Sequence, residues 1–422
     1  MENQAYKPRI LDEQIERYLS VAGAVLLEGP KWCGKTWTCS WHASSAVYLD
    51  DPAGNFQNRR LAELSPDLVL KGSVPRLLDE WQEVPPLWDA VRFEIDKRNA
   101  KGQFLLTGSA TPRHKGILHS GTGRIARLRM SPMSLAESGD STCQVSLKGL
   151  MSGEFTPAYT GEVSLERLFE LIVRGGWPGN LGTPAKDAGI LPRQYLRAVI
   201  EEDVYKLDGI QRDLGKMELL LRSLARNEST TASIRTLQKD ISANGKGEVN
   251  EETISAYLDI FNRLFLLDNQ KPFSSSGLRS SARVKQLEKR HFSDPSLTAA
   301  LLQATPEKLM NDLESAGFLF EALCERDLRI YASAMDGKLF HYQDYNGREL
   351  DAVVEGPDGE WLAVEIKLGA GQIDNAAKNL VSTTKAMGGT PPKALVVLCG
   401  LSNAAYRRPD GVYVVPPTAL TA

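Results

Sequence analysis

The feature that most constrains this chain is an eight-residue stretch near its beginning, Gly29-Pro30-Lys31-Trp32-Cys33-Gly34-Lys35-Thr36. Its spacing is that of a phosphate-binding loop, with a glycine, four free positions and then Gly-Lys-Thr. The apolar run 25–27 before it predicts a strand, and the residues after it are expected to continue as a helix. The glycines permit a tight turn whose N–H groups face phosphate oxygens, and the helix amino terminus adds partial positive charge. These flanks favour a phosphate site over an ordinary glycine turn.

Each chemical group of this stretch has an expected role. The Lys35 ammonium is expected to reach the β- and γ-phosphates of a nucleotide, and the Thr36 hydroxyl to ligate a magnesium ion. The residues predicted to contact the nucleotide here are Gly29, Pro30, Lys31, Trp32, Cys33, Gly34, Lys35, Thr36 and Trp37.

Two acidic residues form the expected second half of the site. Residues 75–78 predict a strand that ends at Asp79 and Glu80. The carboxyl ends of parallel strands share one sheet edge, so this pair is expected to lie near the phosphate-binding loop. Asp79 is then placed to hold magnesium through its water shell, and Glu80 to orient and deprotonate the attacking water.

Polar groups that follow two later strands are further candidates. The buried run 104–106 leads into Thr107 and Ser109, whose hydroxyls are either sensors of the γ-phosphate or parts of an ordinary strand-ending turn. Arg124 precedes the predicted fifth strand, 125–130, which also carries Arg127 and Arg129. Such arginines act on phosphate within the chain, act across a subunit boundary in a homo-oligomer, or are simply solvated.

Composition limits the remaining choices. The 422 residues predict two to four domains, and 50 basic against 53 acidic side chains require any nucleic-acid surface to be a local patch. Five scattered cysteines fit neither a zinc site nor a disulfide framework. Without an apolar segment of signal or membrane-spanning length, a cytoplasmic protein with no membrane partner is expected.

Several motifs resemble those of prokaryotic AAA-type (AAA+) ATPases in which the ATPase module is joined to a carboxyl-terminal domain of unknown function. The similar stretches are 26–36, 77–85, 106–109, 123–124, 131–135, 175–178 and 294–297. The resemblance implies a five-stranded α/β core, ATP as ligand, magnesium and slow hydrolysis. The sequence departs from the family pattern at Lys31-Trp32, often Arg-Gln, and at Glu201-Glu202-Asp203, where an arginine is expected before the aspartate.

The middle of the chain reads as helical. Residues 136–161 are rich in Ser, Gly and Thr and predict a linker, and the helical patterns after it are expected to form a lid. Helical patterns at 232–241 and 251–264, followed by an apolar run at 265–267, resemble a winged helix. A basic loop comes next and either neutralises nucleic-acid phosphates or is solvated. Its basic residues are Lys271, Arg279, Arg283, Lys285, Lys289 and Arg290.

The last third predicts a second constellation. A strand containing Asp351 and a return strand containing Glu365 and Lys367 are joined by a Gly-Pro-Asp-Gly turn, so a hairpin brings the three together. Two carboxylates and a lysine can hold magnesium and activate water, although a plain cross-strand ion pair is the alternative. The arrangement resembles the restriction-endonuclease-like fold. That resemblance implies metal ligation by Asp351 and Glu365, charge stabilisation by Lys367, and an auxiliary metal ligand in Glu321.

The complete prediction is an α/β protein of four segments. These are an AAA+-like P-loop core (1–135), a linker and helical lid (136–228), a winged-helix-like region (229–292) and a restriction-endonuclease-like domain (293–422). The favoured function is a magnesium-dependent ATPase that acts near DNA or another nucleic acid. The alternatives are a nucleotide-switched interaction protein whose rear domain binds a partner without cleavage, and, less favoured, a small-molecule kinase.

Overall fold

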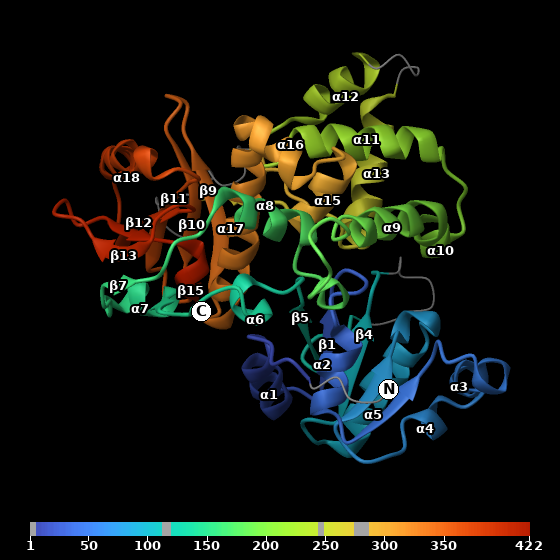
Figure 1. The fold of residues 1–422 in the computed structure, drawn as a ribbon. Coiled ribbons are helices and arrows are strands. Elements are labelled where there is room, and N and C mark those ends of the chain that lie inside the picture. The colour runs from blue at the N-terminus through green and yellow to red at the C-terminus, as the bar shows by residue number, and fades with distance from the viewer. Residues whose placement is uncertain (1–5, 112–119, 244–248, 274–286) are drawn as a thin grey trace. The chain divides into compact units, whose positions relative to one another are not determined.

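The computed structural model describes residues 6–111, 120–243, 249–273 and 287–422 (Figure 1). The chain divides into two compact units. The first comprises residues 1–132, 201–212 and 260–266, and the second comprises 133–200, 213–259 and 267–422. Within the described parts of the chain, none of the helices combines the length and the apolar character needed to span a bilayer. The four-segment division of the chain stays a prediction.

The first unit is built on a five-stranded parallel sheet with the order β2-β3-β4-β1-β5. The strands expected at 25–27, 75–78, 104–106 and 125–130 are all present, and β2 completes the sheet. Their bounds are β1 Ala24–Glu28, β2 Ser45–Tyr48, β3 Arg76–Asp79, β4 Phe104–Gly108 and β5 Ile125–Arg129. The central strands β1 and β4 are almost wholly buried, as continuous apolar runs in a parallel sheet should be.

Helices of this unit follow the strands and supply the rest of its apolar core. Trp88, Val91 and Ile95 share one face of α5 and pack in the same cluster as Leu26 and Leu106 of the sheet. The helices are α1 Asp12–Val21, α2 Lys35–His42, α3 Ala53–Leu64, α4 Pro66–Val69 and α5 Leu87–Arg98, with the 3-10 turn η1 Trp81–Glu83. The helix expected after the phosphate-binding loop is therefore present as α2.

The second unit contains most of the remaining helices. They are α6 Leu135–Ser138, α7 Leu147–Ser152, α8 Leu165–Arg174, α9 Ile190–Ala198, α11 Leu214–Arg226, α12 Ile234–Ala243, α15 Pro295–Leu301, α16 Pro306–Asn311, α17 Leu313–Ala334 and α18 Ile373–Met387. The π-helical turn η3 Val199–Asp203 and helix α13 Glu251–Arg263 cross from one unit into the other, and α10 Val204–Asp208 lies in the first.

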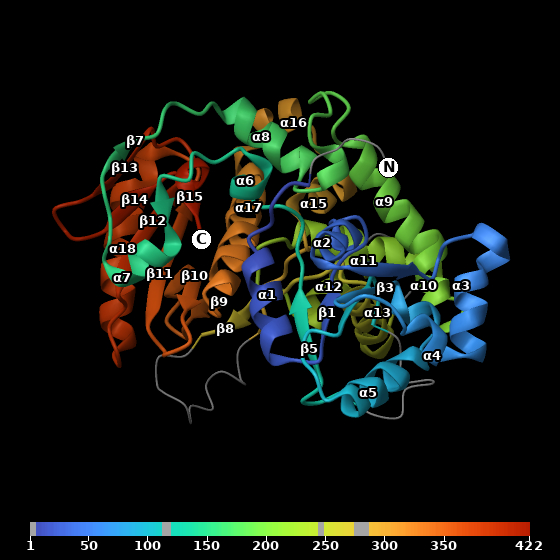
Figure 2. The same cartoon turned by 90° about the horizontal axis from the view of Figure 1, so that it is seen from below.

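An eight-stranded mixed sheet organises the carboxyl-terminal part of the second unit (Figure 2). Its order is β7-β13-β14-β12-β11-β10-β9-β8. The strands are β7 Ala158–Tyr159, β8 Lys271–Pro272, β9 Lys338–Gln343, β10 Glu349–Glu355, β11 Trp361–Lys367, β12 Ala394–Cys399, β13 Ala404–Arg407 and β14 Tyr413–Val415. The predicted hairpin is present, with Ala352 opposite Val364 across β10 and β11. A parallel-sheet core, a helical middle and a carboxyl-terminal α/β region are thus confirmed.

The predicted linker has more structure than its composition indicates. Its strand β6, Val145–Ser146, pairs with β15, Leu420–Thr421, and β7 pairs with β13. Both partners lie more than 240 residues later in the sequence, so no local pattern could have revealed them. The reading of 136–161 as only a linker was therefore wrong.

The winged-helix-like region has its two helices, α12 and α13, but the strand expected at 265–267 is absent. Leu267 instead forms an isolated antiparallel bridge with Phe292, and Gln270 forms another with Lys289. Strand β8 then joins the edge of the eight-stranded sheet beside β9. The winged helix stays a prediction.

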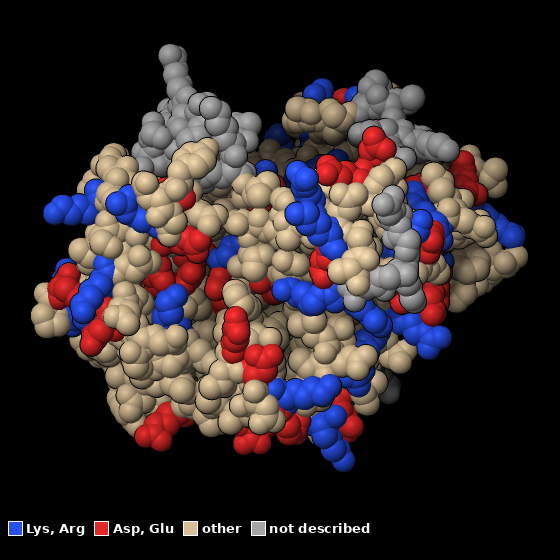
Figure 3. Space-filling model, turned by 90° about the horizontal axis from the view of Figure 1, so that it is seen from above, with Lys and Arg blue, Asp and Glu red and all other residues tan. Residues whose placement is uncertain are grey.

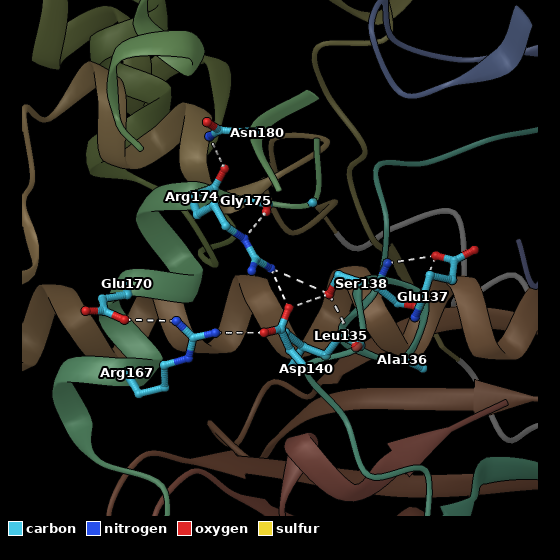
Figure 4. Close-up of polar contacts among 12 residues, drawn as sticks. Leu135, Ala136, Glu137, Ser138, Asp140, Arg167, Glu170, Arg174, Gly175 and Asn180 are labelled. Carbon is cyan, nitrogen blue, oxygen red and sulfur yellow. Dashed lines mark hydrogen bonds and ion pairs between the residues drawn. The ribbon is translucent and has the colours of Figure 1, made fainter. Parts of the chain in front are cut away.

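Polar contacts fasten the segment after α6 to helix α8 (Figure 4). The Asp140 carboxylate accepts hydrogen bonds from Arg174, Arg167 and Ser138 at 2.7, 2.8 and 2.6 Å. These partners hold the pKa of Asp140 below its usual value even though burial acts in the opposite direction. These contacts hold Asp140, in the segment after α6, against helix α8, which ends just before Gly175.

Candidate functional site

The phosphate-binding loop has the backbone that its two glycines predict. A side chain at position 29 would place its Cβ 2.2 Å from the Met130 carbonyl oxygen, so only glycine fits there. Gly34 has a φ of 104° and is the residue before α2, a conformation that other residues rarely adopt. The loop therefore joins β1 to the amino terminus of α2 through a turn whose shape depends on glycine.

The Lys35 side chain lies inside this loop. It is 4% exposed, and its ammonium donates hydrogen bonds to the carbonyl oxygens of Gly29 and Pro30 at 3.0 and 2.8 Å. A positive charge is therefore held within the concave backbone, which is where an anionic phosphate would need it.

Asp79, at the end of β3, contacts one residue of α2 and one of β4. Its Oδ1 atom accepts hydrogen bonds from the Thr36 hydroxyl at 2.9 Å and from the Thr107 hydroxyl at 2.6 Å. Burial raises the pKa of Asp79 to about 6, and the carboxylates of Glu80 and Asp50 act in the same direction against these two hydrogen bonds. The expected approach of Thr36 to Asp79 is present in the structure.

Glu80 is held beside the same edge. Its backbone adopts a left-handed conformation with φ 55°, and its N–H donates to the Thr107 hydroxyl at 2.9 Å. The Glu80 carboxylate accepts hydrogen bonds from the Ser109 hydroxyl at 2.8 Å and from the Gln82 amide. Both hydroxyls named from the sequence therefore contact the acidic pair, whereas Gln82 was missed.

Arg124 does not lie with this group. The N–H of Ala24, at the beginning of β1, donates to the Arg124 carbonyl oxygen, whereas the phosphate-binding loop follows the other end of β1. The Arg124 guanidinium pairs with Asp96 at 2.9 Å. The prediction that Arg124 contacts a nucleotide within its own chain was wrong, because a residue that precedes a parallel strand lies at the opposite edge of the sheet from residues that follow one.

Two further contacts hold the loop and were not foreseen. The buried Arg9 guanidinium donates to the carbonyl oxygens of Cys33 and Ser131, both at 2.9 Å. The Lys31 ammonium forms an ion pair of 2.5 Å with Asp203, a residue 172 positions later in the sequence. Lys31, one of the residues that depart from the family pattern, therefore contacts Asp203, the aspartate that directly follows the other departure.

In the second unit the hairpin brings its predicted residues together. The Lys367 ammonium lies 2.9 Å from Asp351 and 2.8 Å from Glu365. Asn379 of α18 donates to Glu365 at 2.6 Å, a contact that the sequence did not indicate. Burial and the nearby Asp351 raise the pKa of Glu365 to about 7. Burial alone would lower the pKa of Lys367, but the two carboxylates raise it above its ordinary value.

A second ammonium lies among the acids of this region. Lys289 contacts Glu321, lies 3.0 Å from Glu325, and donates to the Asp351 carbonyl oxygen at 3.2 Å. Its assignment to a solvated or phosphate-binding loop was therefore wrong. Lys271 and Arg290 are described, whereas Arg279, Arg283 and Lys285 lie outside the described residues.

Burial and neighbouring charges together set the pKa values of these buried groups. Desolvation and the neighbouring carboxylates raise the pKa of Glu321 to about 8, despite the opposing effect of Lys289. His291 contacts Glu228 and Glu325, and these acids outweigh burial and raise its pKa to about 9. His291 and Lys289 in turn hold the pKa of Glu325 at about 2 against desolvation.

The remaining family-like motifs make packing contacts. The Gly176 N–H and the Arg326 guanidinium both donate to one Asp294 oxygen at 2.9 Å, and the Trp177 indole donates to Ser296 at 2.8 Å. The Met133 N–H donates to the Gly176 carbonyl oxygen at 2.6 Å. Motifs 131–135, 175–178 and 294–297 thus converge on one buried point.

Three families match successive parts of the chain. Residues 22–139 match a family described as an AAA domain. The matched residues include the five-stranded parallel sheet and the phosphate-binding loop. Residues 165–308 and 316–420 match two families, each described as a domain of unknown function.

Similar proteins and structures were also found. Uncharacterized proteins of Mycobacterium bovis and Mycobacterium tuberculosis are each 24% identical over 347 residues, which cover 81% of this chain and 70% of the relative. A Walker-type ATPase of Pyrococcus abyssi is 12% identical, with a TM-score of 0.41, and 69% of this chain and 94% of that one are covered. The Aeropyrum pernix ORC1 protein, solved in complex with DNA, is 15% identical with a TM-score of 0.26. The match covers 69% of this chain and 92% of that one.

Proposed function

We propose that the first unit binds ATP with magnesium and hydrolyses it. The observation that carries this proposal is the convergence of Thr36 and Thr107 on one oxygen of Asp79, beside a loop that encloses the Lys35 ammonium. The loop follows β1, Asp79 ends β3 and Thr107 lies near the end of β4, so the fold brings together groups that could hold phosphate and magnesium. The match of residues 22–139 to an AAA domain supports the same activity.

The residues present fit a nucleotide and its metal. The loop N–H groups and Lys35 would hold phosphate oxygens, while Thr36 and Asp79 would hold magnesium. When bound, magnesium neutralises charge on the phosphates. Glu80 would accept the proton of the attacking water, and Ser109 and Gln82 fix the direction of its carboxylate.

Lys35→Ala tests this proposal. We expect the affinity for ATP to fall at least about a hundredfold, because the buried charge inside the loop is lost. Isothermal titration would measure this affinity, and thermal unfolding would show whether the fold persists. Lys97→Ala, which removes an exposed lysine of α5, is the matched control and should bind ATP as the unaltered chain does. Unchanged ATP affinity in Lys35→Ala would refute the assignment.

For the rear domain we infer partner binding without metal-dependent cleavage. Asp351, Glu365 and Glu321 are each paired with a lysine ammonium, and no three His, Cys, Asp or Glu side chains of the described residues are grouped so as to hold a metal ion. Five carboxyl groups face three cations in this cluster, and two of the five have pKa values near or above 7. Those carboxyl groups are Glu228, Glu321, Glu325, Asp351 and Glu365, and the cations are Lys289, His291 and Lys367.

The consequence is that Asp351, Glu365 and Glu321 already have ammonium partners in this structure. Magnesium would have to displace these ammonium groups before it could bind. The ion pairs therefore favour the interpretation of this protein as a nucleotide-switched interaction protein. On the face that Figure 3 draws, basic and acidic side chains are interspersed. Association with nucleic acid and formation of a homo-oligomer stay predictions.

A cleavage assay decides between the two hypotheses for the rear domain. With magnesium present, we expect single-stranded DNA, duplex DNA and RNA to remain intact. Cleavage that disappears in the double variant Asp351→Ala with Glu365→Ala would refute metal-free binding and restore the nuclease hypothesis. Lys35→Ala, which leaves the hairpin unchanged, is the control for cleavage driven by ATP.

A further inference from the structure

The ion pair between Lys31 and Asp203 joins the phosphate-binding loop to a distant segment. Lys31 occupies the second free position of the loop, and its side chain is 46% exposed. The Asp203 side chain is only 8% exposed and ends the π-helical turn η3. Lys31, which belongs to the loop, is therefore the solvent-accessible partner of the ion pair, and Asp203 is the buried partner.

The Lys31 ammonium has a potential second partner of higher charge. A terminal phosphate has a second pKa near 6 and carries almost two negative charges at pH 7, whereas Asp203 offers at most one. Because Lys31 belongs to the loop that would enclose the phosphates, a triphosphate competes with Asp203 for the same ammonium. A diphosphate also ends in a doubly charged phosphate, but this is the β-phosphate, which the loop N–H groups and Lys35 would already hold. It therefore presents no γ-phosphate to Lys31 and competes less.

We propose that Lys31 distinguishes nucleoside triphosphate from diphosphate by exchanging Asp203 for the terminal phosphate. This inference rests on the proposed nucleotide site. In the diphosphate state the ion pair holds residues 201–212 on the first unit. In the triphosphate state Lys31 turns to the phosphate, and Asp203 loses its cation.

The position of Asp203 in the chain gives this exchange a consequence. Residues 201–212 belong to the first unit, but the residues on both sides of them, up to 200 and from 213, belong to the second. A contact that is made or broken at Asp203 therefore acts on the covalent connection between the two units. The exchange offers a route by which the bound nucleotide can alter the second unit.

The same segment contains a matched control. Lys206 pairs with Glu202 at 3.1 Å, four residues apart on an exposed surface. Such a pair contributes little to stability and touches no part of the loop. Lys206→Met therefore removes the same charge as Lys31→Met from a neighbouring ion pair that the proposal does not use.

Affinities for ATP and ADP, measured by titration with the full chain and magnesium, test the exchange. Lys31→Met should bind ATP about tenfold more weakly and ADP about equally well, since only the terminal phosphate loses a partner. Asp203→Asn should bind ATP severalfold more tightly, because the competing carboxylate is gone. Lys206→Met should resemble the unaltered chain with both nucleotides.

Hydrogen exchange gives a readout that does not depend on affinity. Amides of residues 201–212 should exchange faster with ATP than with ADP in the unaltered chain, and equally with both nucleotides in Lys31→Met. Equal losses of ATP and ADP affinity in Lys31→Met, or no gain in Asp203→Asn, would overturn the exchange while leaving the nucleotide site intact. If the unaltered chain binds neither nucleotide, both the proposed function and this inference fail.

Discussion

Asp79 combines a chemical requirement with a cost in stability. The buried carboxylate has its pKa raised from 3.8 to about 6, so the folded state binds a proton more tightly than the unfolded state does. The free energy of unfolding therefore falls as the pH rises from about 4 to about 6, and the cost remains at higher pH. Ionisation is nevertheless what would allow Asp79 to hold magnesium.

Asp79→Asn should separate these two effects. The amide oxygen can still accept from Thr36 and Thr107, so at pH 8 we expect a gain of up to about 3 kcal/mol, at roughly 1.4 kcal/mol per pKa unit. The gain should disappear near pH 4. Magnesium-dependent ATP hydrolysis should be lost. Chemical denaturation across this pH range and a phosphate-release assay would measure the two effects.

The exposed Asp50 provides the control for Asp79→Asn. It lies close enough to affect the ionisation of Asp79 but is itself in contact with solvent. Asp50→Asn should change the free energy of unfolding by less than about 0.5 kcal/mol. A loss of stability in Asp79→Asn at pH 8 would contradict the assigned cost of burying this carboxylate.

At the scale of elements, Gly176 sets how closely the end of α8 approaches the segment before α6. A Cβ at this position would lie 2.0 Å from the Met133 carbonyl oxygen and 2.8 Å from the Met133 nitrogen. Gly176→Ala must therefore separate two backbones that now share a hydrogen bond. We expect a loss of about 3 kcal/mol, from overpacking and from that bond, visible as a lower thermal midpoint.

A second glycine provides a control for which we expect the substitution by alanine to raise, and not lower, the free energy of unfolding. Gly317 lies within α17, and a Cβ there would meet no atom within 4 Å. Gly317→Ala should raise the free energy of unfolding by about 0.5–1 kcal/mol, because alanine loses less conformational entropy in a helix. Similar effects from the two substitutions would show that the close approach at Gly176 does not limit stability.

At the scale of the whole molecule, sequence order and spatial grouping differ. The first unit takes in residues 201–212 and 260–266 in addition to the amino-terminal third of the chain. The Arg263 side chain donates to the Thr111 carbonyl oxygen at 3.0 Å, and the Arg129 guanidinium lies 5.4 Å from the centre of the Phe265 ring. The middle of the chain therefore contributes residues to the first unit.

Local patterns were sufficient for the five-stranded core and for much of the candidate nucleotide site. Apolar runs mark the buried strands, and glycine spacing marks the loop. Polar residues at strand ends mark the edge where ligands bind, so Lys35, Thr36, Asp79, Glu80, Thr107 and Ser109 could be named. The hairpin with Asp351, Glu365 and Lys367 was found because a turn motif separates two alternating strands.

The sequence by itself thus determined most strands of the parallel sheet, the carboxyl-terminal hairpin, the phosphate-binding loop and the polar residues that follow the strands, because each depends on nearby positions in the chain. Only the tertiary structure decided which distant charges meet. It paired Lys31 with Asp203, placed Lys289 among the carboxylates of the rear cluster, and set Arg124 at the opposite edge of the sheet. The physical reason is that an ion pair depends on distance in space, and a charged residue has the same local pattern whether its partner is a distant side chain or water.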